Sequence, residues 1–152
     1  MGEKSKIEWT NASWNPTTGC TKVSAGCANC YAETLALRLQ KTGSYRYRNA
    51  FNLTMHEDAL NLPLKWKQPK RIFVNSMSDL FHKDVTDNFI DKVWEVMEKA
   101  HWHNFQILTK RPERMVKYSW TKSLLPNVWL GTSVEDARVK DRIKILSNTN
   151  AK

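Results

Sequence analysis

The sequence contains no run of eighteen apolar residues, and its first residues lack the apolar core of a secretory signal. We therefore expect no membrane span and a cytoplasmic location. Cysteine is also scarce, with three in the chain. An odd number of thiols in a reducing compartment is not explained by a disulfide framework. Internal repeats, low-complexity segments and obvious linkers are likewise absent, which favours one continuous domain over residues 1–152.

The chain has fewer acidic than basic residues. The 152 residues include 24 Lys and Arg against 15 Asp and Glu, a net charge of +9, while 41% of the residues are hydrophobic and seven are Trp. This composition predicts a folded chain with a core. The charge favours an anionic partner such as nucleic acid or an anionic small molecule, although a merely basic surface explains it equally well. The basic, aromatic segment 45–48 fits either an exposed base or a solvated loop.

Strand, polar loop and helix alternate along the chain. Buried-strand patterns occupy residues 71–75, 105–109 and 128–131, and the helical patterns after them give βα units at about 70–100, 104–120 and 127–147. A weakly marked strand and a helix at 28–41 make the cysteine-loop segment, 14–41, a first unit. Thr54 and Glu57 also form a capping-box pattern that predicts a short helix. The fold class is therefore α/β, with a parallel sheet like part of a TIM-type (β/α) barrel, truncated to about four units.

Three cysteines lie close together as Cys20-x6-Cys27-x2-Cys30. Thiolates at this spacing can reach one metal centre and leave a coordination position open. We favour an iron–sulfur cluster of the 4Fe–4S type. Zinc with a fourth donor such as His82, a redox CxxC pair with Cys20 as bystander, and three unrelated thiols are the alternatives.

Polar residues follow each predicted strand. In a parallel sheet these loops share one rim, where ligands bind. Two carboxylates and two cations beside a metal would suit a zwitterionic ligand. For any one of these side chains, helix capping or a solvated loop is the better explanation, but four polar loops together favour function. The candidate ligand-binding residues are Asn75, Ser76, Ser78, Asp79, Thr109, Lys110, Arg111, Ser133 and Glu135.

Four stretches together resemble a phage-associated three-Cys-motif protein family. They are WNPTTGCTKVSAGCANCYAE at 14–33, FVNSMSDLFH at 73–82, LTKRPER at 108–114 and NVWLGTSVE at 127–135. That family is distantly similar to radical S-adenosylmethionine enzymes, some of which act on DNA lesions. The superfamily spacing is CxxxCxxC, which differs from the spacing here.

The resemblance implies a partial (β/α)6 barrel in which Cys20, Cys27 and Cys30 hold a 4Fe–4S cluster and its open iron binds S-adenosylmethionine. It places Asn75 to Asp79 near the amino end of that cofactor, and Ser133 and Glu135 near its ribose or carboxylate. Family members are longer, so we expect a truncated chain that lacks about two strands. Such a barrel would not close, which would leave the chain inactive unless a partner protein completes it.

The sequence thus predicts an iron–sulfur enzyme of the radical S-adenosylmethionine type, or its N-terminal part, acting on nucleic acid or a nucleotide. The alternatives are a non-catalytic zinc module that binds nucleic acid and a phage-encoded protein-interaction module. No acid, base or hydrogen-transfer residue is assigned.

Overall fold

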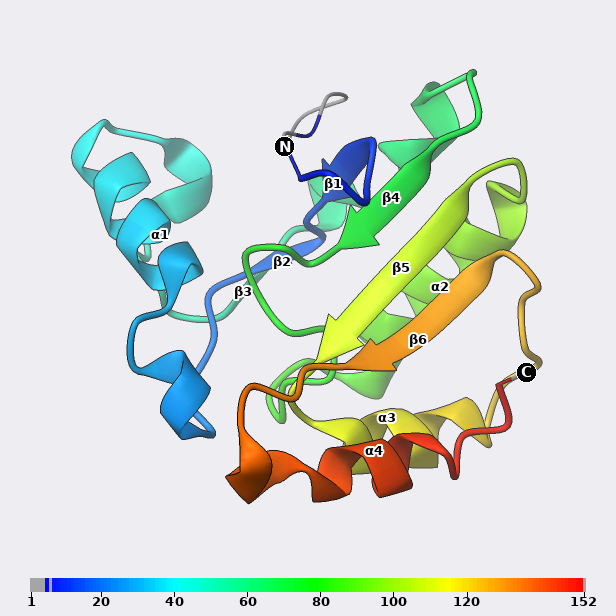
Figure 1. Ribbon diagram of the computed structural model, residues 1–152. Helices are drawn as coiled ribbons and strands as arrows, with labels where there is room; N and C mark the ends of the chain where they lie inside the picture. The colour runs from blue at the N-terminus through cyan, green and yellow to red at the C-terminus, as the bar shows by residue number, and fades with distance from the viewer. Residues whose placement is uncertain (1–4, 6, 152) are drawn as a thin grey trace.

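The central element is an open parallel sheet. The computed structural model describes residue 5 and residues 7–151 (Figure 1). Strands β1 (Ala12–Trp14), β4 (Arg71–Val74), β5 (Asn104–Thr109) and β6 (Val128–Thr132) lie in the order β1-β4-β5-β6, and all neighbouring pairs are parallel. The predicted parallel α/β sheet is confirmed. The sheet is not closed, however, so the structure shows an open sheet rather than a TIM-type barrel.

Helices follow the three long strands as predicted. They are α2 (Asp87–Lys99), α3 (Pro112–Ser119) and α4 (Asp141–Leu146), the last preceded by a short 3-10 turn, Ala137–Val139. The Thr86 hydroxyl accepts a hydrogen bond from the Phe89 N–H at 3.2 Å, which confirms the predicted cap of α2. No helix among the described residues is long and apolar enough to cross a membrane.

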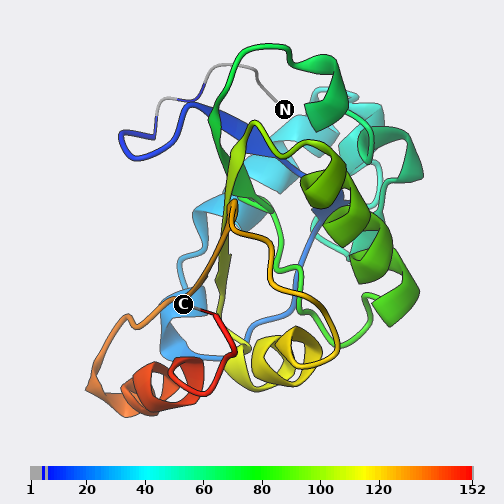
Figure 2. The same ribbon diagram turned by 90° about the vertical axis from the view of Figure 1, so that its right-hand side faces the viewer.

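The main core lies between the sheet and the helices α2 and α3, which cover one sheet face (Figure 2). Strand side chains alternate, so every second one enters this core. The largest fully buried apolar side chains here are Trp14, Ile72, Val74, Leu80, Phe81, Ile90, Met97, Phe105, Ile107 and Met115. This packing fixes the carboxyl ends of the strands as one rigid rim.

The segment between β1 and β4 forms a second, smaller layer. Helix α1 (Tyr31–Lys41) packs with the 3-10 turn Tyr45–Tyr47 around a small cluster that includes Ala36 and Met77. The predicted helix at 28–41 starts three residues late, because a 3-10 turn, Ala25–Cys27, precedes it. Further 3-10 turns span Glu57–Ala59 and Pro63–Lys65.

The capping-box prediction at Thr54 was wrong. Residues Thr54–Met55 form strand β3, which pairs antiparallel with β2 (Thr17–Thr18). Pairing with a segment almost forty residues away along the chain takes this stretch out of the helical conformation that the local pattern favours.

Candidate functional site: a cysteine pocket at the carboxyl rim

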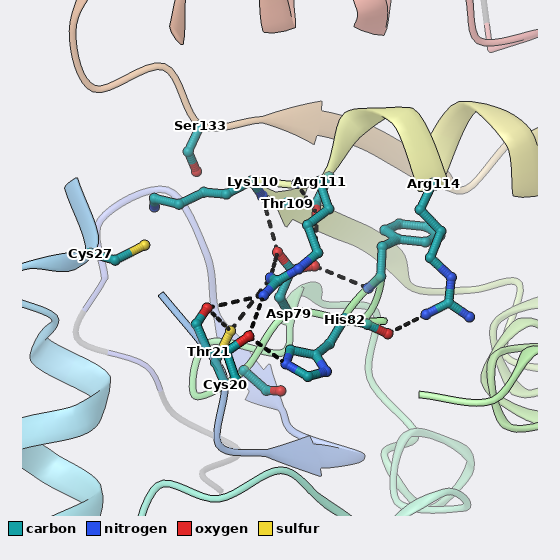
Figure 3. Close-up of polar contacts among 12 residues, drawn as sticks. Cys20, Thr21, Cys27, Asp79, His82, Thr109, Lys110, Arg111, Arg114 and Ser133 are labelled. Carbon is teal, nitrogen blue, oxygen red and sulfur yellow. Dashed lines mark hydrogen bonds and ion pairs between the residues drawn. The ribbon is translucent and has the colours of Figure 1, made fainter. Parts of the chain in front are cut away.

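A pocket of about 550 Å³ lies at the carboxyl ends of the strands. All three cysteines line it, from the segment between β2 and α1. Eight of the nine predicted ligand-binding residues line it too; Glu135 does not. Four loops that are distant in sequence therefore meet here, as the parallel arrangement requires (Figure 3). The eight are Asn75, Ser76, Ser78, Asp79, Thr109, Lys110, Arg111 and Ser133.

Gly19 brings the cysteine loop against the loop after β4. Its N–H donates to the Met77 carbonyl at 3.0 Å, and the Ser78 hydroxyl donates to the Gly19 carbonyl at 2.6 Å. Gly19 has a φ of +79°, and a Cβ there would lie 2.2 Å from the Asn52 carbonyl oxygen. Only glycine fits both the conformation and the space. Ser78 is therefore engaged in fixing the loop that carries Cys20.

Asp79 is the hub of the rim. Its buried carboxylate accepts four hydrogen bonds: from the Thr109 hydroxyl at 2.7 Å, the Phe81 N–H at 3.0 Å, the Lys110 N–H at 3.1 Å and Arg111 Nη1 at 2.9 Å. Both carboxylate oxygens are thus occupied by the protein. Asp79 and Thr109 build the site and hold Arg111 in place, rather than offering oxygens to a ligand.

Arg111 connects this hub to the cysteine loop. Its Nη2 donates to the carbonyl and hydroxyl oxygens of Thr21, at 3.0 and 3.1 Å, and its Nη1 lies 3.5 Å from Cys20 Sγ (Figure 3). Burial raises the pKa of the Cys20 thiol above its ordinary value, and the guanidinium opposes that rise. The planar fork of an arginine suits such a multiple contact.

His82, the candidate fourth donor in the zinc alternative, is fully buried behind Thr21. Its Nδ1 accepts from the Asp84 N–H at 3.2 Å, so Nε2 carries the proton and donates to the Thr21 hydroxyl at 2.8 Å. Burial, reinforced by the charge of Arg111, lowers the pKa of His82. Both ring nitrogens are therefore engaged, and His82 supports the loop from behind.

Cys27 and Cys30 flank the start of α1. Cys27 ends the 3-10 turn, and Cys30 is the N-cap residue of α1, so Cys30 lies at the positive end of the helix dipole. Burial raises the pKa of Cys27, but backbone hydrogen bonds at Val23 and Ser24 and the charge of Lys110 outweigh it and lower the pKa overall. The Cys27 thiol is thus more acidic than an ordinary cysteine.

Glu135, which follows β6, holds the cysteine loop through a hydrogen bond to Ser24. Its Oε1 accepts from the Ser24 hydroxyl, and its Oε2 accepts from Arg142 Nη1 at 2.8 Å. A Cβ at Gly26 would lie 2.4 Å from Glu135 Cγ, so the two residues are in close contact. Arg142 also donates to the Ser133 carbonyl at 2.9 Å. Like Asp79, Glu135 has its carboxylate occupied by protein groups.

Three polar groups of pocket-lining residues have no hydrogen-bond partner among the described residues: Asn75 Nδ2, which is itself buried, the Lys110 ammonium and the Ser133 hydroxyl. Asn75 is 2% exposed and has a φ of +61°, and its Oδ1 accepts from the Thr17 N–H at 3.2 Å. Asn adopts a positive φ more readily than most residues, so the turn explains the backbone conformation, and the buried donor without a partner is what makes Asn75 a candidate ligand contact. Ser76 differs, since its hydroxyl donates to Asn15.

Within residues 5 and 7–151, no three His, Cys, Asp or Glu side chains form a compact group around one point. The thiols instead lie around the pocket wall. Sequence reasoning missed Thr21, which stands beside Cys20 and links Arg111 to His82. It also missed the aromatic wall of Trp9, Tyr31, Phe51 and Phe73. No local pattern marks these residues, because only the fold brings them to the pocket.

These features define an open α/β protein with a three-cysteine pocket at the carboxyl rim of its parallel sheet. The chain belongs to the family described as "Protein of unknown function (DUF5131)", whose model matches residues 4–152. No curated protein and no solved structure matches the chain.

Proposed function

We propose that this chain is an iron–sulfur enzyme of the radical S-adenosylmethionine type, or its N-terminal part, with Cys20, Cys27 and Cys30 as cluster ligands. One observation supports this most directly. Three thiols and the unpartnered groups of Asn75 and Lys110 line one pocket at the carboxyl rim. A thiolate set beside free polar groups suits a metal centre that also binds an organic ligand.

The residues present fit such a centre. Three cysteines supply soft thiolate donors, and His82, whose ring nitrogens are engaged, leaves a position on the metal open. The helix α1 N-terminus and Lys110 both favour negative charge on sulfur. A volume of about 550 Å³ lies within the usual range of small-molecule sites, roughly 300–1,000 Å³.

When bound, the cluster and S-adenosylmethionine would supply one-electron reductive cleavage that yields a carbon radical. The chain itself would bind and orient. Lys110 offers a cation for a carboxylate, Asn75 Nδ2 offers a hydrogen bond, and Ser133 offers a hydroxyl that suits a ribose. Asp79 and Glu135 hold the loops that carry these groups, which revises the direct ligand contact first expected of them.

The sequence supports the proposed phage origin, the partial barrel, the cellular setting and the substrate class. The resemblance to the phage-associated three-Cys-motif family supports a phage origin and a partial barrel, which a partner protein would extend at the open sheet edge. Three free thiols support a reducing, cytoplasmic setting. The net charge of +9 supports a nucleic-acid or nucleotide substrate.

Anaerobic reconstitution with iron and sulfide tests the cluster. We expect a broad visible absorbance from thiolate-bound iron and about four irons and four sulfides per chain. Cys30→Ala should lose most of the signal. Thr42→Ala is the matched control at the other end of α1, because its hydroxyl contacts only the carbonyl of Leu39 among the described residues. A colourless protein that retains one tightly bound zinc would contradict the proposal and favour the zinc module.

A further inference from the structure

Helix α1 carries an exposed row of side chains that leads away from the cysteine pocket (Figure 1). The members of this row recur at spacings of three or four residues, so they lie along one face of the helix. They are Tyr31, Thr34, Arg38 and Lys41. Tyr31 lines the cysteine pocket, and the helix is about 16 Å long at 1.5 Å per residue. The row therefore runs from the pocket to the far end of α1.

The 3-10 turn Tyr45–Tyr47 lies at that far end. The Gln40 amide donates a hydrogen bond to the Arg48 carbonyl at 3.0 Å, which holds the turn against the end of α1. Tyr45 is 76% exposed, and the Arg48 guanidinium lies over its ring, 4.2 Å from the centroid. Arg48 Nη1 also donates to the Tyr45 carbonyl at 3.2 Å. One face of the ring is thus covered by a fixed cation, and the other is open to solvent.

The same surface carries positive charge without acidic neighbours. Residues 34–56 contain four Lys and Arg and no Asp or Glu. Arg46 pairs with Asp58, whereas Arg38, Lys41 and Arg48 form no ion pair among the described residues. A solvated protein surface usually mixes charges of both signs. An acid-free surface that also holds an aromatic ring in place therefore suits a partner that is both anionic and able to stack.

We propose that the exposed face of α1 and Tyr45 form a docking surface for single-stranded nucleic acid, which leads one strand to the cysteine pocket. A base stacks on the open face of Tyr45, and Arg38 and Lys41 neutralise phosphates between that base and the pocket. A duplex does not expose the base faces that stacking needs, and an acidic protein segment has none. The inference rests on the proposed function in one respect: it names the substrate class that the cysteine pocket would act on.

Fluorescence anisotropy with labelled oligo-dT tests the stacking. An oligonucleotide of about 16 nucleotides covers the known range of single-strand binding sites. Loss of one base stack predicts that Tyr45→Ala weakens binding by roughly 5- to 150-fold. Tyr45→Phe is the matched control, because it keeps the ring and should bind like the wild type. Since the side chain is largely exposed, both variants should keep the wild-type unfolding temperature.

A pair of double variants tests the path along α1. Arg38→Gln with Lys41→Gln removes two phosphate contacts, which should reduce the slope of log affinity against log salt by about 1.4, at about 0.7 per phosphate. Lys65→Gln with Lys67→Gln is the matched control. It removes the same charge from exposed positions just before β4, at the amino end of the sheet and therefore away from the pocket. This control should leave the slope close to that of the wild type.

Four results would overturn the proposal. The wild type could fail to bind oligo-dT, or Tyr45→Ala could bind it as tightly as Tyr45→Phe does. The two double variants could reduce the salt slope equally, which would mean that net charge alone binds the strand. The wild type could also bind a duplex or polyglutamate at least as tightly as oligo-dT at the same salt, and the surface would then serve duplex nucleic acid or an acidic protein.

Failure of the proposed function is read separately from failure of this inference. Cys30→Ala should lose the cluster absorbance and keep oligo-dT binding, whereas Tyr45→Ala should keep the absorbance and lose binding. A colourless protein that still binds oligo-dT through Tyr45 would contradict the proposed function alone.

Discussion

Replacing Arg111 tests how the cysteine loop is held. The guanidinium forms an ion pair with the buried Asp79 carboxylate at 2.9 Å and two hydrogen bonds to Thr21. Arg111→Ala leaves Asp79 with three of its four donors, all weaker than a charged partner. Breaking a buried pair by removing one partner costs about 3–5 kcal/mol, and the remaining donors favour the lower end, about 3 kcal/mol. In a chain of this size that lowers Tm by about 6–12 °C.

Thermal and urea unfolding of three variants provide the measurement. Arg111→Lys should recover part of the loss, because an ammonium can pair with Asp79 but cannot also reach both oxygens of Thr21 as the fork does. Arg138→Ala is the control, since its ion pair with Asp136 is local and exposed, and we expect no measurable change there. If Arg111→Ala unfolds at the same temperature as Arg138→Ala, the reasoning about the hub is refuted.

Two further predictions concern the same loop. Gly19→Ala should destabilise the protein by about 1–3 kcal/mol, because the added Cβ meets the backbone of Asn52 and the positive φ disfavours any L side chain. Urea unfolding measures this loss, and an unchanged unfolding midpoint would contradict the prediction. Burial lowers the pKa of His82 in the folded protein, so at mildly acidic pH the unfolded chain binds more protons than the folded protein does. The contribution of neutral His82 to stability is therefore complete above about pH 6.5 and is lost as pH falls below that value. His82→Gln should flatten this part of the stability profile relative to the surface variant His101→Gln, and parallel profiles would show that His82 is not the cause.

The sequence was sufficient for the elements with a clear period. Strands β4, β5 and β6 and helices α2 and α3 appear within a few residues of their predicted places, because each is long enough for its apolar spacing to show. Strand β1 has three residues, too few for a recognisable alternation. Thr54 was misassigned because a strand partner distant in sequence decided its conformation.

The candidate site was predictable in position but not in roles. Parallel strands must end at one rim, so the polar residues after β4, β5 and β6 could be grouped from the sequence alone. Which of these polar side chains remain free to bind a ligand depends on contacts between segments that are distant in the sequence. Glu135 reaches Ser24 across 111 residues of chain, and Arg111 reaches Thr21 across 90. Such contacts have no local signature.

The two carboxylates first assigned to ligand binding hold the cysteine loop at two separate points. Asp79 acts through Arg111 on Thr21, next to Cys20, and Glu135 acts on Ser24, three residues before Cys27. These contacts fix the cysteine loop from both β5 and β6, so part of the entropic cost of ordering it is met during folding rather than during ligand binding. Asn75 and Lys110, which have unpartnered polar groups, line a pocket whose walls are already held in place by these contacts. A selective site for a small charged ligand needs such a preorganised pocket.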